Sequence, residues 1–180
     1  MTTSYLDPAP VIDLTRTSLR SAAWAWDDAL SATLRHDART ARRVLRLEAA
    51  RRSGLRSARR RLEQHPDHEA LRTSRLVVDD LVRVDRLLNQ LAQDVLGPGG
   101  GLPGDCTHHV ELVRSVGTRR LLDLARTLPV AGVDTGYVRD GQRLVRAWTI
   151  LHDRPTGDVA VCAQLAASLV EISRHVTGTV

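Results

Sequence analysis

The chain has 180 residues, 42% of them hydrophobic and 26% charged, so it can form one globular domain or two small domains that share a core. Aromatic residues make up only 3%, and Phe is absent; this composition favours an all-helical protein with an aliphatic core. No apolar run approaches the roughly 20 residues that a membrane span needs, and we see no signal peptide. Two cysteines do not make a disulfide framework, so we expect a cytoplasmic protein.

The net charge of +5 is concentrated in one segment. Residues 35–61 contain eleven Arg against two acidic residues, a local charge of +9, whereas the remaining residues together carry −4. The chain is therefore not basic throughout, but this one segment would attract acidic partners.

The first predicted elements are an arm and a helix. Residues 1–12 contain two prolines and little pattern, so we expect a loose arm. Asp13 is a candidate N-cap, and the helix after it is predicted to end near His36. Trp24 lies off the inward face of this helix, which suggests a second contact. The inward face itself comprises Leu19, Ala23, Trp26, Leu30 and Leu34.

A second helix of about 27 residues is predicted after the candidate cap Asp37, and it ends before His65-Pro66. The middle of its inward face is charged, and a buried face tolerates charges only when they have partners. That face comprises Ala41, Val44, Glu48, Arg51, Leu55, Ala58 and Leu62. Its outer faces are crowded with Arg.

The third helix, residues 71–96, has the clearest pattern. Its apolar residues alternate at spacings of four and three, which is typical of a helix packed lengthwise against others: Val77, Leu81, Val84, Leu88, Leu91 and Val95. In a second stripe beside them, Asp85 and Asn89 lie one turn apart and interrupt an apolar row.

Five Gly and two Pro in residues 97–104 predict a linker, after which the helical pattern begins again. Three further helices are predicted, separated by a turn at 129–136 and by Arg154-Pro155. We therefore expect an all-α fold of six helices: two three-helix bundles, at 13–96 and 105–180, packed side by side as an internal repeat.

The second and third predicted helices resemble the PhoU family of phosphate-uptake regulators, whose fold is two repeated three-helix bundles. The segments that carry the resemblance are LRHDARTARRVLRLEAARRSGL and LRTSRLVVDDLVRVDRLLNQLA, about 60 residues with the loop between them, and the second half matches only in layout. In the third helix, matching positions include Leu71, Arg72, Asp85 and Arg86. The resemblance implies a regulator that contacts a phosphate transporter and a sensor kinase, and dimers are frequent in the family.

PhoU proteins carry pairs of carboxylates one turn apart that can hold metal clusters. Here the partner of Asp85 is Asn89, and the partner of Glu48 is Arg52. An arginine can balance a carboxylate in a bidentate pair without any metal. We therefore predict that the degenerate metal motif of Glu48, Asp85 and Asn89 is vacant and that its acids are held by arginines, the candidates being Arg51, Arg52 and Arg86. The competing interpretation is that Asp85 and Asn89 are solvated side chains without a role.

The arginines on the outer faces of the second helix form a candidate docking stripe for an acidic protein partner. The stripe comprises Arg39, Arg42, Arg43, Arg46, Arg56, Arg59 and Arg60. Two alternatives are a nucleic-acid-binding protein that uses the same stripe and a plain helical scaffold or dimerisation module.

We find no catalytic motif, no glycine-rich phosphate-binding loop with its lysine and no zinc-site spacing, so we expect neither an enzyme nor a cofactor. The weaker metal candidates are His65 with His68 and Glu69, Cys106 with His108 and His109, and Glu171 with His175. The last two residues are more typical of a surface pair.

Overall fold

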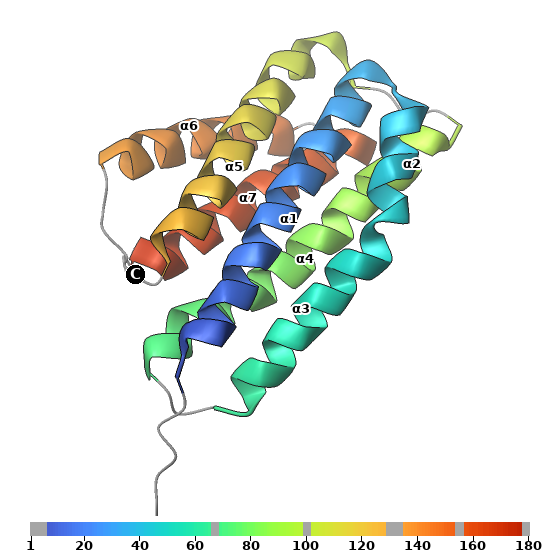
Figure 1. The fold of residues 1–180 in the computed structure, drawn as a ribbon. Coiled ribbons are helices and arrows are strands. Elements are labelled where there is room, and N and C mark those ends of the chain that lie inside the picture. Colours follow the sequence, from blue (N-terminus) through green and yellow to red (C-terminus); the bar gives the residue numbers. More distant parts are fainter. Residues whose placement is uncertain (1–6, 66–68, 99–101, 129–134, 154–156, 178–180) are drawn as a thin grey trace, which may run out of the picture.

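The computed structural model describes residues 7–65, 69–98, 102–128, 135–153 and 157–177. These residues form an all-α fold, as predicted, with seven α-helices (Figure 1): α1 (Ala9–Arg35), α2 (Ala38–Arg46), α3 (Glu48–Glu63), α4 (Arg72–Leu96), α5 (Thr107–Thr127), α6 (Thr135–His152) and α7 (Gly157–Thr177). Short 3-10 turns at Glu69–Leu71 and Gly104–Cys106 precede α4 and α5.

The first helix begins at Ala9, earlier than predicted. Pro10 lies in its first turn, where a proline costs no helix hydrogen bond, and Asp7 Oδ1 accepts from the Ala9 N–H at 2.9 Å. The prediction of Asp13 as the cap is therefore wrong; Asp13 pairs with Arg16 one turn on. Residues 1–6 of the predicted arm lie outside the described residues, as do the middle of the 97–104 linker and most of the 129–136 turn.

The second predicted helix is two helices. Asp37 caps α2 as predicted and accepts from the backbone N–H of Arg39 and Thr40, and its bonds to Thr40 lower the pKa of its carboxyl group. The helix is then interrupted at Leu47, and α3 begins with the next residue. At this interruption the Val44 carbonyl accepts from the side chain of Arg51 at 2.8 Å, which supplies a donor from outside the helix ladder.

One hydrophobic core runs through both halves of the chain. α1 packs most extensively against α5, and α4 packs against α7, so helices of the first half lie directly on helices of the second. α2 and α3 cover α1 and α4 on one flank, while α6 packs on α7 and α5 on the other (Figure 1). The arrangement as two separate bundles side by side is thus not confirmed.

Trp26 and Gly117 set the distance between α1 and α5. Trp26 is completely buried, and its indole N–H donates to the Val113 carbonyl of α5 at 3.1 Å. A Cβ atom at Gly117 would overlap the indole ring, so only glycine allows this approach. The sequence places Trp26 on an inward face but does not show that it meets Gly117.

The helix α7 has the length and composition of a membrane-crossing helix over Gly157–Val176. A core helix of a soluble protein has the same properties, and 56% of this stretch is buried against the rest of the molecule.

Candidate functional site

Arg51 lies at the centre of a buried polar cluster between α3 and α4. Its Nε donates to Asp85 Oδ1 at 2.6 Å, and its Nη2 donates to Asn89 Oδ1 at 2.6 Å. Asn89 in turn donates from Nδ2 to Asp85 Oδ2 at 3.2 Å. The spacing of Asp85 and Asn89, one turn apart on α4, places both acceptors in front of one planar guanidinium.

The third nitrogen of the guanidinium reaches α2. Arg51 Nη1 donates to the Val44 carbonyl, close to the interruption at Leu47. One side chain thereby joins the end of α2, the start of α3 and the middle of α4. Because each guanidinium nitrogen has an acceptor, the cost of burying the charge is offset by hydrogen bonds as well as by Asp85.

The exposed fractions of the Arg51 and Asp85 side chains are 6% and 7%, and Asn89 is equally buried. The interpretation of Asp85 and Asn89 as solvated side chains is therefore wrong. Both oxygens of the Asp85 carboxylate accept hydrogen bonds, and the cluster joins α2, α3 and α4.

The other predicted charge partners occupy different positions. Glu48 pairs with Arg52 of the next turn at 2.5 Å, and Arg52 Nε lies 3.8 Å from Asp85 Oδ2. Arg86 is exposed and lines a cleft between α3 and α4 instead of joining the buried cluster. Within the described ranges, no group of three His, Cys, Asp or Glu residues is arranged to hold a metal ion.

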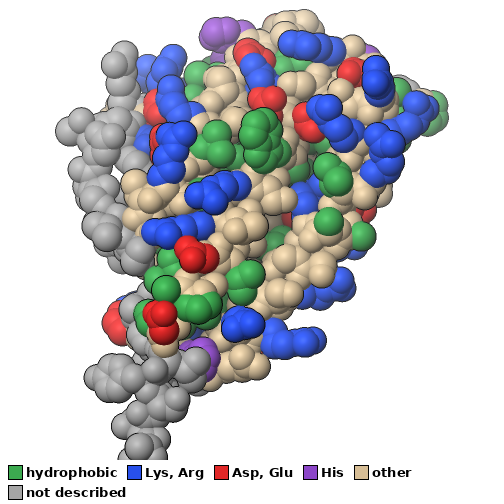
Figure 2. All heavy atoms as spheres, viewed as in Figure 1, with side chains coloured by type: hydrophobic (Ala, Val, Ile, Leu, Met, Phe, Trp, Pro, Cys, Tyr) green, Lys and Arg blue, Asp and Glu red, His purple; other side chains and the backbone are tan. Residues whose placement is uncertain are grey.

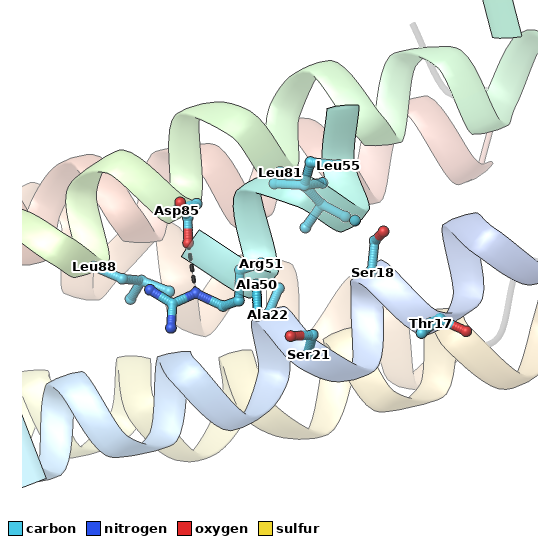
Figure 3. Close-up of a pocket in the computed structure, with 11 residues that line it drawn as sticks. Thr17, Ser18, Ser21, Ala22, Ala50, Arg51, Leu55, Leu81, Asp85 and Leu88 are labelled. Atoms are coloured by element: carbon cyan, nitrogen blue, oxygen red, sulfur yellow. Dashed lines mark hydrogen bonds and ion pairs between the residues drawn. The ribbon is translucent and has the colours of Figure 1, made fainter. Parts of the chain in front are cut away.

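A small cavity of about 100 Å³ lies beside the cluster, between α1, α3 and α4 (Figure 3). Asp85 points from α4 toward Arg51, while the hydroxyl groups of Ser18 and Ser21 project from α1. Leucines of α3 and α4 form another part of the wall. The cavity has room for a few water molecules at most, so it does not by itself indicate a substrate.

All seven arginines of the predicted docking stripe are exposed. Arg43 pairs with Asp28 of α1 at 2.5 Å, and Arg59 lies near Glu63 and Asp79 at 3.4 and 3.7 Å. In the described part of the chain the other five have no ion pair: Arg39, Arg42, Arg46, Arg56 and Arg60. The stripe is thus largely uncompensated.

On α2, the residues Arg39, Arg42 and Arg46 follow the i, i+3, i+7 spacing of one helix face, and with Leu45 they line an open groove. Arg43 lies next to them on the side that faces α1, where it reaches Asp28. In Figure 2, arginine side chains gather over α2 and α3, with hydrophobic side chains exposed between them and over α1.

An apolar groove of about 250 Å³ runs between α1 and the junction of α2 with α3. Trp24 and Leu47, 69% and 52% exposed, are the most exposed large hydrophobic residues in the described ranges, and both line this groove. Sequence reasoning placed Trp24 off the inward face but missed Leu47, because the interruption that turns Leu47 outward is not visible in the periodicity.

A second buried ion pair was not predicted. Arg120 of α5 and Asp140 of α6 are both buried, and their side chains approach to 3.3 Å, while Arg119 reaches the same Asp140 oxygen. The pair holds α6 against α5. Neither residue carries a local motif that could have revealed it.

Among the described residues, the histidine candidates form no group of three that could hold a metal ion. His108 and His109 contact each other edge to face, and Cys106 is buried, while His68 lies outside the described residues. The predicted surface pair of Glu171 and His175 is wrong. Glu171 pairs with Arg174, and His175 Nδ1 lies 2.7 Å from Asp80 Oδ2 of α4, where burial raises the pKa of Asp80 and the contact with His175 partly opposes this rise.

Comparisons of the chain with protein-family models, with curated proteins and with solved structures gave no match.

Proposed function

We propose that this protein is a helical regulatory adaptor that binds an acidic segment of a protein partner across α1 and α2. The observation that carries the proposal is the position of Trp24 and Leu47 in one groove, directly beside the arginine face of α2. Exposed aromatic side chains next to arginines are typical of protein-binding surfaces.

The partner's chemistry follows from this surface. The uncompensated guanidinium groups of Arg39, Arg42 and Arg46 favour carboxylates. The groove favours an apolar side chain placed between them. An amphipathic segment with acidic residues around one or two large hydrophobic residues fits both requirements. The resemblance to PhoU supports phosphate transport or its sensor kinase as the setting.

Pull-down from the source cell with three forms of the protein tests the proposal. The first variant combines Arg39→Glu, Arg42→Glu and Arg46→Glu, and the second is Trp24→Ala. A control with the same change of charge on other helices combines Arg72→Glu, Arg126→Glu and Arg146→Glu, all exposed positions. We expect a partner with an acidic segment to be retained by wild type and control and lost by both face variants.

Recovery of the same partners by all forms would refute this surface. A transporter subunit or sensor kinase among the lost partners would support the PhoU-like setting.

The nucleic-acid alternative rests on the same uncompensated arginines, and it is tested by titrating random duplex DNA at low and physiological salt. Binding that falls steeply with salt and is lost in the arginine variant but not in the control would favour that alternative over a protein partner.

A further inference from the structure

The cleft between α3 and α4 is a second basic feature, separate from the α1–α2 face. It has a volume of about 350 Å³ and is lined by four arginines, by Leu55 and Val82, and by the edge of Asp85. The four arginines are Arg52, Arg56, Arg59 and Arg86.

The geometry of the two helices brings these arginines together. Arg52, Arg56 and Arg59 recur on α3 at spacings of four and three, so they share the face turned toward α4. Arg52 approaches Asp85, and Arg59 approaches Asp79, so α3 and α4 run antiparallel along the cleft. Arg56 therefore lies between the two ends.

Charge within the cleft is unbalanced. Asp85 is already neutralised by Arg51, whose Nε contacts Asp85 Oδ1 and which does not line the cleft. Arg52 is paired with Glu48, and the contacts of Arg59 are long and exposed. In the described part of the chain, Arg56 and Arg86 have no carboxylate within ion-pair distance.

We propose that this cleft binds the phosphate chain of a small di- or triphosphate compound. Guanidinium groups match phosphate oxygens in geometry and stay charged at all working pH values, and several of them converging on one cleft can neutralise a multiply charged chain. Leu55 and Val82 provide an apolar floor that can also carry the base of a nucleotide. The site uses arginines other than those of the α1–α2 face, so it does not depend on the proposed function.

Calorimetric titration of the full-length protein with pyrophosphate, tripolyphosphate and ATP at low salt tests the proposal, with sulfate at matched ionic strength as the reference. The decisive variant combines Arg56→Gln and Arg86→Gln. Its matched control combines Arg60→Gln and Arg83→Gln, which remove the same charge from exposed positions of the same two helices outside the cleft.

We expect saturable binding of the phosphate compounds, at least tenfold weaker in the cleft variant and within about twofold of wild type in the control. Circular dichroism verifies that both variants are folded. Equal affinity for tripolyphosphate and ATP would assign the site to the phosphate chain alone, and tighter binding of ATP would assign it to a nucleotide. Absence of saturable binding by all three compounds, binding no tighter than that of sulfate, or an equal loss in the cleft variant and the control would overturn the proposal.

Discussion

Arg51 and Asp85 form a charged pair at 2.6 Å in the interior of the molecule, with 6% and 7% of their side chains exposed. Removing one partner of such a pair leaves the other charge buried without compensation, which costs more than the pair itself contributes. We expect Arg51→Met to lower the free energy of unfolding by about 3–5 kcal/mol, measured by urea denaturation followed by circular dichroism.

A triple variant with Arg51→Met, Asp85→Leu and Asn89→Leu removes the whole polar cluster from α3 and α4. Because no buried charge is left, we expect it to be more stable than the single variant. A single variant that loses less than about 1 kcal/mol would show that water reaches Asp85 and screens its charge.

Gly117→Ala is expected to destabilise the protein although alanine favours helices. The added methyl group overlaps the buried Trp26 ring, and overpacking of this kind costs about 1–3 kcal/mol, more than the gain of up to about 1 kcal/mol in helix propensity. The matched control is Gly54→Ala in α3, where a Cβ atom meets nothing within 4 Å. Thermal unfolding should show a lower Tm for the first variant and a higher Tm for the second, and the same shift in both would contradict the close contact.

Arg114 joins α5 to α1 through Asp27 and pairs with Glu111 on its own helix. The hydrogen bond from Arg114 lowers the pKa of Glu111, so this contribution to stability is present above the ordinary pKa of Glu and is lost as the pH falls through the lowered value. Since these side chains are partly exposed, we expect Arg114→Gln to cost no more than about 1 kcal/mol at pH 7.

Urea denaturation of wild type and the Arg114 variant at pH 7 and pH 3 measures this effect. The difference between them should shrink toward pH 3, because the carboxylates become protonated. Arg126→Gln is the control, since the Arg126 side chain is 74% exposed and, among the residues that the structure describes, its ion pair is with Asp123 of the same helix. A difference that stays constant with pH would assign the role of Arg114 to packing rather than to charge.

We expect Cys162 to make the stability of the protein depend on pH at the alkaline end. Burial raises the pKa of its thiol far above the ordinary value of 9.0, and the nearby Asp158 and Cys106 add to the effect. In the unfolded chain the thiol ionises near its ordinary pKa, whereas in the folded chain it stays protonated. The folded state therefore holds more protons, and stability falls as the pH rises above about 9.

The slope from one thiol is at most about 1.4 kcal/mol per pH unit. We expect the stability of wild type to fall more steeply between pH 9 and 10.5 than that of Cys162→Ala, by up to this amount. Parallel curves for the two proteins would mean that the thiol also ionises in the folded state.

Much of the fold follows from periodicity. The inward faces of the first three predicted helices correspond closely to buried residues, and the charged middle of the second helix correctly predicted that Arg51 needs a partner. The pattern of the third helix also marks Asp85 and Asn89 as candidate partners, because both interrupt an apolar stripe. Local patterns are enough to predict a contact where each of its two residues stands out in the pattern of its own helix.

Other features depend on how helices meet, and local patterns do not show this. The interruption at Leu47 is bridged by the side chain of Arg51, seven residues from Val44. Arg120 of α5 forms an ion pair with Asp140 of α6. His175 contacts Asp80, which lies 95 residues earlier in the chain. The rotation of α3 and α4 about their own axes decides which of Arg51, Arg52 and Arg86 is buried. Residue spacing fixes this rotation only approximately.

The fit of Trp26 against Gly117 also constrains how this protein can change over evolutionary time. A larger residue at the glycine costs stability unless the tryptophan becomes smaller, and a smaller ring leaves a void that glycine cannot fill. The two positions should therefore vary as a pair among descendants of this sequence. This contact couples the N-terminal half to the C-terminal half, so a change in one half favours a compensating change in the other.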